Sequence, residues 1–230
     1  MKLSIIVLSY NEEKTFPELI KKVKNIRLPK GIEKEILVVD DCSKNNVRLI
    51  LEKLGKDKSL RVIRHETNQG KGACIKTGIE KSTGEIIVPQ DGDLEYDPND
   101  IPKLLKIMIE NNYEAIYGSR LKRKFRQLYI ANYVGNRNLT GLINLLYGAC
   151  LTDSMTCYKM FRRSAFSGIG LKSRGFEFDA EITCKLLKKG VKIHEEMINY
   201  FPRTYEQGKN IKWADGFKIL FTILKCRFFG

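Results

Sequence analysis

Residues 86–95 read IIVPQDGDLE, a short apolar run that ends in two carboxylates, Asp91 and Asp93, on either side of Gly92. A continuous apolar run of this length is typical of a buried parallel strand, so both acids should follow its carboxyl end, the edge at which open α/β sheets bind ligands. Carboxylates two residues apart on a strand point the same way and repel each other unless a cation lies between them. Because oxygen ligands suit Mg²⁺ or Mn²⁺, the segment predicts a divalent-cation site. The alternative interpretation is an ordinary polar turn after a strand.

Strand-like and helix-like patterns alternate on both sides of this segment. Short β-branched runs predict strands at 3–8, 35–39, 60–64, 85–88 and 114–117, and amphipathic spacing predicts helices at 18–26, 47–54, 73–81 and 101–110. The second half is less regular, with predicted helices at 139–146, 178–187 and 211–229 and predicted strands at 156–161 and 191–200. This alternation predicts an α/β fold with a mostly parallel, Rossmann-like central sheet and helices on both faces, in one domain over residues 1–230.

Polar residues recur where the predicted strands end, at Tyr10-Asn11-Glu12, Asp40-Asp41, Asp91-Asp93 and Ser119-Arg120. Four such tips on the ligand-binding edge of one sheet indicate a site rather than chance. Asp40-Asp41 could instead cap the following helix. The glycine-rich segment 68–72 either contacts a nucleotide or simply opens a helix, since the GxxxxGK[ST] and GxGxxG phosphate-binding motifs are absent.

The chain is strongly basic, with 41 Lys and Arg against 27 Asp and Glu and a formal net charge of +14 over 230 residues. This charge favours an anionic partner such as nucleic acid, a phosphorylated metabolite or an anionic membrane, or else a lysine-rich solvated surface. Six scattered cysteines without a CxxC pair, and only two histidines, argue against a zinc site and suit free thiols in a reducing cytosol. No signal peptide and no apolar run of 18 residues is found, so we expect a chain that is soluble or lies on a surface.

These motifs together resemble the family 2 glycosyltransferases of the GT-A fold, and more narrowly their polyprenyl-phosphate branch, the dolichyl-phosphate mannose synthase-like enzymes. The resemblance covers nearly the whole chain and depends on the order and spacing of six segments rather than on any one of them. They are Ser9-Tyr10-Asn11-Glu12, Val39-Asp40-Asp41-x-Ser43, Asn68-x-Gly70-Lys71-Gly72, Asp91-Gly92-Asp93-Leu94-Glu95, Gly118-Ser119-Arg120 and Arg203-Thr204-Tyr205-x-x-x-Lys209.

The resemblance implies a role for each matched residue. Residues 1–120 would bind the nucleotide sugar, with Asp91, Asp93 and Glu95 holding Mg²⁺ or Mn²⁺ against its diphosphate. Residues 121–210 would form the acceptor half. The acceptor's phosphate would be received by Arg120, joined by Arg137 or Arg126. Asp93, Arg120 and Arg203 would be the catalytic residues. The donor would contact Leu8, Tyr10, Glu12, Val39, Asp41, Gly70, Lys71, Asp91, Gly92, Arg203 and Lys209.

The implied reaction is inverting transfer of a hexose, mannose or glucose, from a GDP- or UDP-sugar to a polyprenyl phosphate such as dolichyl or undecaprenyl phosphate. A phosphate monoester, with a second pKa of about 6, is already ionised near neutrality and needs cationic clamping rather than a base. A sugar hydroxyl would need one. If the acceptor were a hydroxyl in a polysaccharide or glycolipid, Glu177 or Asp179 would be the candidate base. A basic nucleic-acid-binding protein is a further alternative, but no recognisable nucleic-acid module is present, so we expect no nucleic-acid partner.

The last predicted helix, 211–229, alternates large apolar residues with Lys212, Lys218, Lys225 and Arg227. This composition suits either a basic amphipathic helix in a membrane interface or a helix docked on the core. Together with a lipid acceptor it predicts a cytoplasmic protein at the cytoplasmic membrane face, in contact with the membrane surface or with a membrane-anchoring partner protein.

Overall fold

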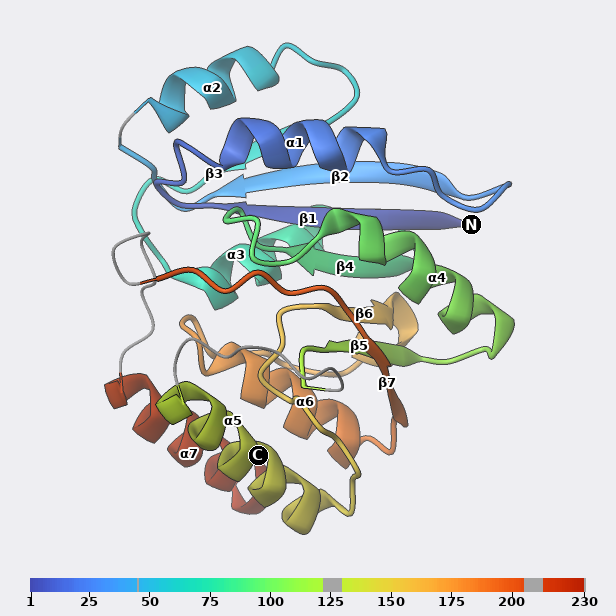
Figure 1. Cartoon of the computed structure of the whole chain (residues 1–230), viewed down its shortest axis with the longest axis vertical. Coiled ribbons are helices and arrows are strands. Elements are labelled where there is room, and N and C mark those ends of the chain that lie inside the picture. Colours follow the sequence, from blue (N-terminus) through green and yellow to red (C-terminus); the bar gives the residue numbers. More distant parts are fainter. Residues whose placement is uncertain (45, 122–129, 205–212, 230) are drawn as a thin grey trace.

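The computed structural model describes residues 1–44, 46–121, 130–204 and 213–229. Seven strands form one sheet in the order β3-β2-β1-β4-β6-β5-β7 (Figure 1). The strands are β1 (Lys2–Ser9), β2 (Glu33–Asp40), β3 (Arg61–Arg64), β4 (Ile86–Gln90), β5 (Ala115–Ser119), β6 (Lys159–Arg162) and β7 (Ile193–Met197). The α-helices are α1 (Phe16–Asn25), α2 (Val47–Leu54), α3 (Lys71–Lys81), α4 (Ile101–Glu110), α5 (Ile130–Tyr147), α6 (Phe178–Lys188) and α7 (Trp213–Phe228). The predicted α/β class and mostly parallel sheet are confirmed.

One strand, β6, runs against the others and lies between β4 and β5. Its pairing places Phe161 opposite both Ile87 and Ala115. Because β6 is antiparallel, its first residue, Lys159, lies beside Tyr117 near the carboxyl end of β5. The segment that leads into β6 therefore arrives at the same edge of the sheet as the carboxyl ends of β4 and β5. The prediction placed this strand at 156–161, so its start was three residues too early and its end one residue too early.

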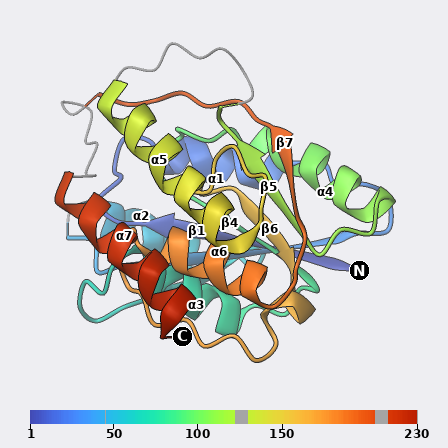
Figure 2. The same ribbon diagram turned by 90° about the horizontal axis from the view of Figure 1, so that it is seen from below.

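The sheet is buried on both faces, as the continuous apolar runs of its central strands require. One core cluster joins Ile5, Val7 and Val88 to α1 and α4 through residues such as Leu19 and Leu104. A second cluster on the opposite face joins alternate strand residues, Ile6 and Ile87 among them, to α3 and α6 through Ile75, Phe178 and Ile182. Figure 2 shows α1 and α4 on one side of the strands and α3 and α6 on the other.

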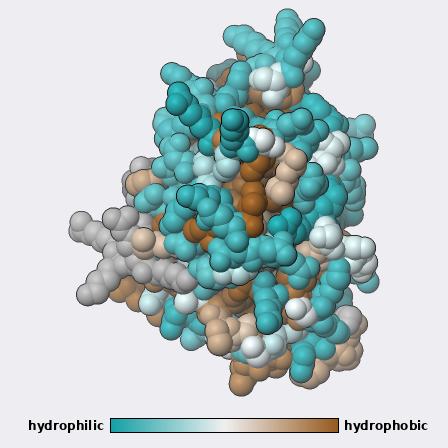
Figure 3. Space-filling view, turned by 90° about the vertical axis from the view of Figure 1, so that its right-hand side faces the viewer, coloured by the Kyte–Doolittle hydropathy of each residue, from teal (hydrophilic) through white to brown (hydrophobic). Residues whose placement is uncertain are grey.

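Helices α5 and α7 form an additional layer against α6, at the lower end of the molecule in Figure 1. Their shared cluster contains Ile143, Cys184, Ile219 and Ile223. One face of α7 is thus docked on the protein, while Phe217, Phe221 and Phe228 on the same helix are 65–67% exposed. Figure 3 shows apolar side chains gathered at this lower end. The docked interpretation therefore describes one face of α7, and contact of the exposed face with a membrane stays a prediction. Among the described residues, no helix has the length and apolar character needed to cross a bilayer.

Candidate active site

The two acids predicted from the segment 86–95 lie just beyond β4, where the chain turns beside β1. Gly92 allows this turn, because a Cβ at that position would lie 2.5 Å from the carbonyl oxygen of Leu8. The turn is closed by the amide of Glu95, which donates to Asp93 Oδ1 at 3.0 Å, and by the Thr15 hydroxyl, which donates to the Gly92 carbonyl at 3.0 Å. The metal-binding residues predicted from the sequence thus occupy one compact turn at the carboxyl edge of the sheet.

Arg203, which follows β7 by six residues, reaches into this turn. Its Nη2 lies 2.7 Å from Asp93 Oδ2, and its Nη1 donates to both carboxylate oxygens of Glu12 at 3.0 Å. Its backbone amide donates to Glu95 Oε1 at 2.8 Å. Arg203 was predicted to bind the donor diphosphate. In this structure its guanidinium is the cation shared by the carboxylates.

The carboxylates in this turn lie close together and repel one another. Burial raises the pKa of Asp93 to about 7, and the neighbouring carboxylates of Asp91 and Glu95 add to the effect while Arg203 opposes it. A buried acid beside two others is the arrangement that a divalent cation relieves. The donor set consists of oxygen atoms alone, which fits Mg²⁺ or Mn²⁺.

Lys71, the first residue of α3, connects the turn to α6. Its ammonium lies 3.0 Å from Asp91 Oδ2 and 3.7 Å from Asp179 Oδ2. The other oxygen of Asp179 accepts a hydrogen bond from the buried ammonium of Lys159 at 3.0 Å. Burial acts to lower the pKa of Lys71, but Asp91, Cys157 and Asp179 outweigh it and hold that pKa well above its usual range. Lys71 is therefore a fixed positive charge at the edge of the carboxylate turn.

Asp41, predicted to contact the base or ribose, is engaged within the protein. Its Oδ1 accepts from the amide of Gln69 at 2.8 Å and lies 2.9 Å from His65 Nδ1, and its Oδ2 accepts from the amide of Gly70 at 2.7 Å. It thus holds the glycine-rich segment in place. Gly70 has φ 94°, and a Cβ there would lie 2.5 Å from the Arg174 carbonyl oxygen, so the segment also depends on glycine.

Asp41, His65 and Cys74 bring three potential metal-ligating atoms within 4.8 Å of one another. The second ring nitrogen of His65 lies 2.9 Å from the Thr77 hydroxyl, so both nitrogens have partners. Burial raises the pKa of the Cys74 thiol above its usual range. The three side chains form a buried hydrogen-bond network.

The remaining predicted donor residues differ in their surroundings. Tyr10, directly after β1, is 44% exposed. The side chains of Leu8 and Val39 are buried in the second core cluster. Lys209 lies outside the described residues, as does Arg126.

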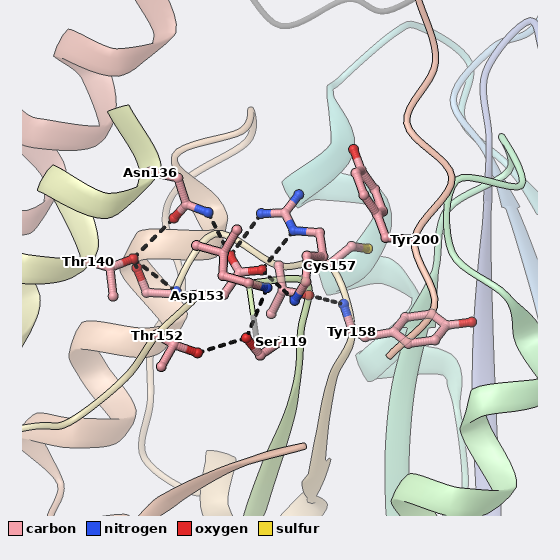
Figure 4. Close-up of polar contacts among 12 residues, drawn as sticks. Ser119, Asn136, Thr140, Thr152, Asp153, Cys157, Tyr158 and Tyr200 are labelled. Atoms are coloured by element: carbon pink, nitrogen blue, oxygen red, sulfur yellow. Dashed lines mark hydrogen bonds and ion pairs between the residues drawn. The ribbon is translucent and has the colours of Figure 1, made fainter. Parts of the chain in front are cut away.

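Arg120, directly after β5, binds Asp153 in a buried polar network. Figure 4 shows Asp153 in this network together with Asn136. Nε and Nη2 of Arg120 each lie 2.8 Å from a different oxygen of Asp153, and Asn136 from α5 donates to Oδ1 of the same carboxylate at 2.8 Å. The guanidinium carbon lies 5.2 Å from the ring centre of Tyr200. Within the described part of the chain, Nη1 of Arg120 has no hydrogen-bond partner, and the side chain keeps 17% of its exposure. Arg120 can therefore still donate to a ligand.

Arg137 is not part of this network. It is exposed on α5, one residue after Asn136, and helical geometry turns neighbouring side chains apart. Sequence reasoning overlooked Asp153, Lys159 and Tyr200 as site residues. The available signals were a lysine within a predicted strand and an aspartate in an apolar segment. Such charged residues are rarely buried without a partner.

The sequence profile described as Glycosyl transferase family 2 matches residues 4–170. The chain belongs to this family. An uncharacterised protein of Methanocaldococcus jannaschii is 30% identical over 99% of this chain and 93% of its own length. A UDP-N-acetylglucosamine–dolichyl-phosphate N-acetylglucosaminyltransferase of Methanococcus voltae is 28% identical over 97% of this chain and 95% of its own length. A dolichol-phosphate mannosyltransferase of Pyrococcus furiosus is 27% identical over 80% of this chain and 53% of its own length.

Solved structures support the fold of this family 2 glycosyltransferase. Glucosyl-3-phosphoglycerate synthase from Mycobacterium tuberculosis, in complex with Mn²⁺, UDP and phosphoglyceric acid, gives a TM-score of 0.75 at 17% identity, over 100% of this chain and 79% of that one. TarS of S. aureus in complex with UDP-GlcNAc gives a TM-score of 0.67 at 20% identity, over 98% of this chain and 66% of that one. The predicted GT-A fold is thereby confirmed.

Proposed function

We propose that this glycosyltransferase is an inverting, metal-dependent enzyme that transfers a hexose, mannose or glucose, from a GDP- or UDP-sugar to a polyprenyl phosphate. The observation that carries the proposal is the pairing of unlike charges at one edge of the sheet. The carboxylates of Asp91, Asp93 and Glu95 lie on one side, and the buried guanidinium of Arg120 lies on the other. Tyr200 touches both sides, which supports their belonging to one site.

On the donor side, Asp91, Asp93 and Glu95 would hold Mg²⁺ or Mn²⁺, which when bound supplies Lewis-acid neutralisation of the leaving nucleoside diphosphate. Structures of glucosyl-3-phosphoglycerate synthase contain UDP with either cation, which supports the combination of a cation and a nucleoside diphosphate proposed here. Lys71 would add a fixed positive charge to the diphosphate, and Arg203 would bind it after leaving the carboxylates, together with Lys209. Residues 1–120 would form this half, with Tyr10 and Asp41 nearest the nucleoside.

On the acceptor side, Arg120 would bind the phosphate through the donors that Asp153 leaves unused, and the exposed Arg137 would assist from outside the network around Asp153. The phosphate oxygen would then attack the anomeric carbon directly, with inversion and without loss of a proton, as the bond from that carbon to the nucleoside diphosphate breaks and the diphosphate leaves with the electron pair. Two relatives whose names include dolichyl or dolichol phosphate support this choice of acceptor. Residues 121–210 would form this half.

The carboxylates that could deprotonate a hydroxyl acceptor are both engaged. Asp179 contacts Lys159 with one oxygen and Lys71 with the other, at 3.0 and 3.7 Å. Glu177 Oε1 accepts from the amide of Gly175 at 3.1 Å in its own loop. A general base needs a lone pair aimed at the substrate, and Asp179 has both oxygens committed to ammonium groups. This favours an acceptor that is already ionised over the sugar hydroxyl of the alternative proposal.

The exposed faces of α5 and α7 would meet the membrane that contains the acceptor. Phe217, Phe221 and Phe228 are exposed on α7, and Ile130 on α5 is 77% exposed. Lys218 and Lys225 on α7 supply positive charge for anionic lipid headgroups. These exposed side chains support our proposal that the enzyme is a peripheral protein at the cytoplasmic membrane face, by itself or with an anchoring partner.

The test incubates the protein with Mn²⁺, a panel of labelled GDP- and UDP-sugars and a short polyprenyl phosphate, and extracts the product into organic solvent. We expect label in the organic phase for one donor, loss of transfer in a chelator, and loss in Asp91→Asn. The matched variant Asp179→Asn separates the two acceptor classes. It should retain transfer to the lipid phosphate, whereas a hydroxyl-using enzyme would lose turnover while still binding its donor.

A further inference from the structure

Tyr200 contacts both halves of the proposed site with one side chain. Its hydroxyl donates to Glu95 Oε2 at 2.7 Å, while its ring lies against the guanidinium of Arg120, with 5.2 Å between the guanidinium carbon and the ring centre. Glu95 belongs to the carboxylate turn, and Arg120 to the network around Asp153. Sequence reasoning gave Tyr200 no role.

The backbone of Tyr200 is fixed independently of its side chain. It forms an isolated antiparallel bridge with Tyr96, and the amide of the next residue, Phe201, donates to the Glu95 carbonyl at 2.8 Å. The preceding residue, Asn199, is bound to the Asp100 carboxylate through both its amide and its side chain, at 2.6 and 3.1 Å. A change in the Tyr200 side chain should therefore leave the segment in place.

Glu95 depends on this hydroxyl for its orientation. A glutamate side chain rotates about three bonds, and here each carboxylate oxygen is held by one donor. Tyr200 holds Oε2, and the amide of Arg203 holds Oε1 at 2.8 Å. Without the Tyr200 hydroxyl, one oxygen of Glu95 would be free to turn away from Asp93.

Arg120 depends on the ring. Its Nε and Nη2 are committed to Asp153, which leaves the face of the guanidinium to be held by aromatic rings. Tyr200 provides the nearer ring, and the ring centre of Tyr96 lies 5.9 Å from the same carbon. A cation over an aromatic face is stabilised by the ring quadrupole, more so where water is excluded.

We propose that Tyr200 is a positioning residue that fixes Glu95 of the donor side relative to Arg120 of the acceptor side, and so aligns the acceptor phosphate with the sugar donor. The proposal extends the function proposed above and rests on it for the role of Arg120. The two contacts of Tyr200 can be removed one at a time. Tyr200→Phe removes the bond to Glu95 and keeps the ring, whereas Tyr200→Leu removes both.

The donor-side test is a double-mutant cycle on Mn²⁺ binding, measured by electron paramagnetic resonance without any acceptor. Since a hydrogen bond to a charged group contributes a few kcal/mol at most, Tyr200→Phe should weaken Mn²⁺ binding about fivefold to tenfold. In a Glu95→Gln background the same change should alter binding by less than about twofold, because its partner is already lost. Tyr113→Phe is the matched control, since Tyr113 stacks on His194 ahead of β5 and should be silent in both backgrounds. Additive effects of Tyr200→Phe and Glu95→Gln would overturn the proposal.

The acceptor-side test is calorimetric binding of geranyl phosphate. Tyr200→Phe should stay within about twofold of wild type, and Tyr200→Leu should weaken binding about threefold to tenfold through loss of the cation–π contact. Wild-type affinity in Tyr200→Leu, with loss of binding in Arg120→Gln, would overturn the proposal. If Arg120→Gln binds geranyl phosphate like the wild type, the acceptor assignment itself is wrong. The Mn²⁺ cycle does not depend on that result, so the two failures are distinguishable.

Discussion

Replacing Arg203 with alanine should destabilise the metal-free protein far more than the metal-loaded protein. The guanidinium makes three contacts of 2.7–3.0 Å with the carboxylates of Glu12 and Asp93, and its Nε lies 3.7 Å from Glu95. These groups are between 12% and 21% exposed, so the site is mostly buried. Removing one partner of a buried ion pair costs about 3–5 kcal/mol, and the residual exposure places Arg203→Ala near the lower end, at about 3 kcal/mol.

The assay is thermal unfolding with a chelator and with saturating Mn²⁺. For a chain of this size 1 kcal/mol corresponds to roughly 2–4 °C, so Arg203→Ala should lower Tm by about 6–12 °C in the chelator. Mn²⁺ should recover at least half of this loss, because a divalent cation neutralises the same carboxylates. Arg48→Ala is the control. Arg48 pairs with Glu52 at the surface, where both side chains are about 60% exposed, and should cost less than about 0.5 kcal/mol in either condition. Equal Tm losses for Arg203→Ala with and without Mn²⁺ would refute the reasoning.

Three further outcomes follow from the same region. Because burial and neighbouring acids raise the pKa of Asp93 to about 7, the folded metal-free protein binds this proton more tightly than the unfolded chain. Its free energy of unfolding should therefore decrease as pH rises through about 7, and Asp93→Asn, followed by urea denaturation between about pH 6 and 8, should remove that decrease. Gly92→Ala should abolish transfer and lower the free energy of unfolding by about 2 kcal/mol or more, since its Cβ would meet the Leu8 carbonyl at 2.5 Å. The control is Gly141→Ala on α5, which has open space around it and should be neutral or stabilising by up to about 1 kcal/mol. Asp41→Asn should lower stability by about 2 kcal/mol and speed hydrogen exchange at the backbone amides of the glycine-rich segment 68–72. Unchanged exchange at these amides would show that Asp41 does not hold the segment.

Local signals sufficed for most of the fold. The segments 47–54 and 101–110 were predicted with the observed bounds, because each has a clear apolar stripe and a distinct start. The edge that holds the site also followed from the sequence, since the carboxyl ends of parallel strands converge there. The reversed direction of β6 did not follow. A four-residue strand carries no information on direction, and its place between β4 and β5 is set by long-range packing.

The candidate site was predictable in its residues more than in its contacts. The sequence predicted Asp91, Asp93 and Arg203 as site residues. It did not predict the ion pair between Arg203 and Glu12, which joins residues 191 positions apart. Asp179 was considered as a base, but its two lysine partners come from α3 and β6, which only the folded chain brings together. Such pairings have no local signature, because nothing in the sequence distinguishes Lys71 and Lys159 from the other lysines.

The antiparallel strand also explains how one sheet edge can serve both substrates. In a wholly parallel sheet, every strand would end at this edge, and the loop after each strand would lead away from it. Because β6 begins there instead, the segment before it crosses the edge between the acids of β4 and Arg120 of β5, and carries Asp153 and Lys159 with it. Asp153 binds Arg120, and Lys159 binds Asp179. The reversed strand and the segment before it therefore supply one counter-ion to the acceptor side, Asp153, and one to the donor side, Lys159.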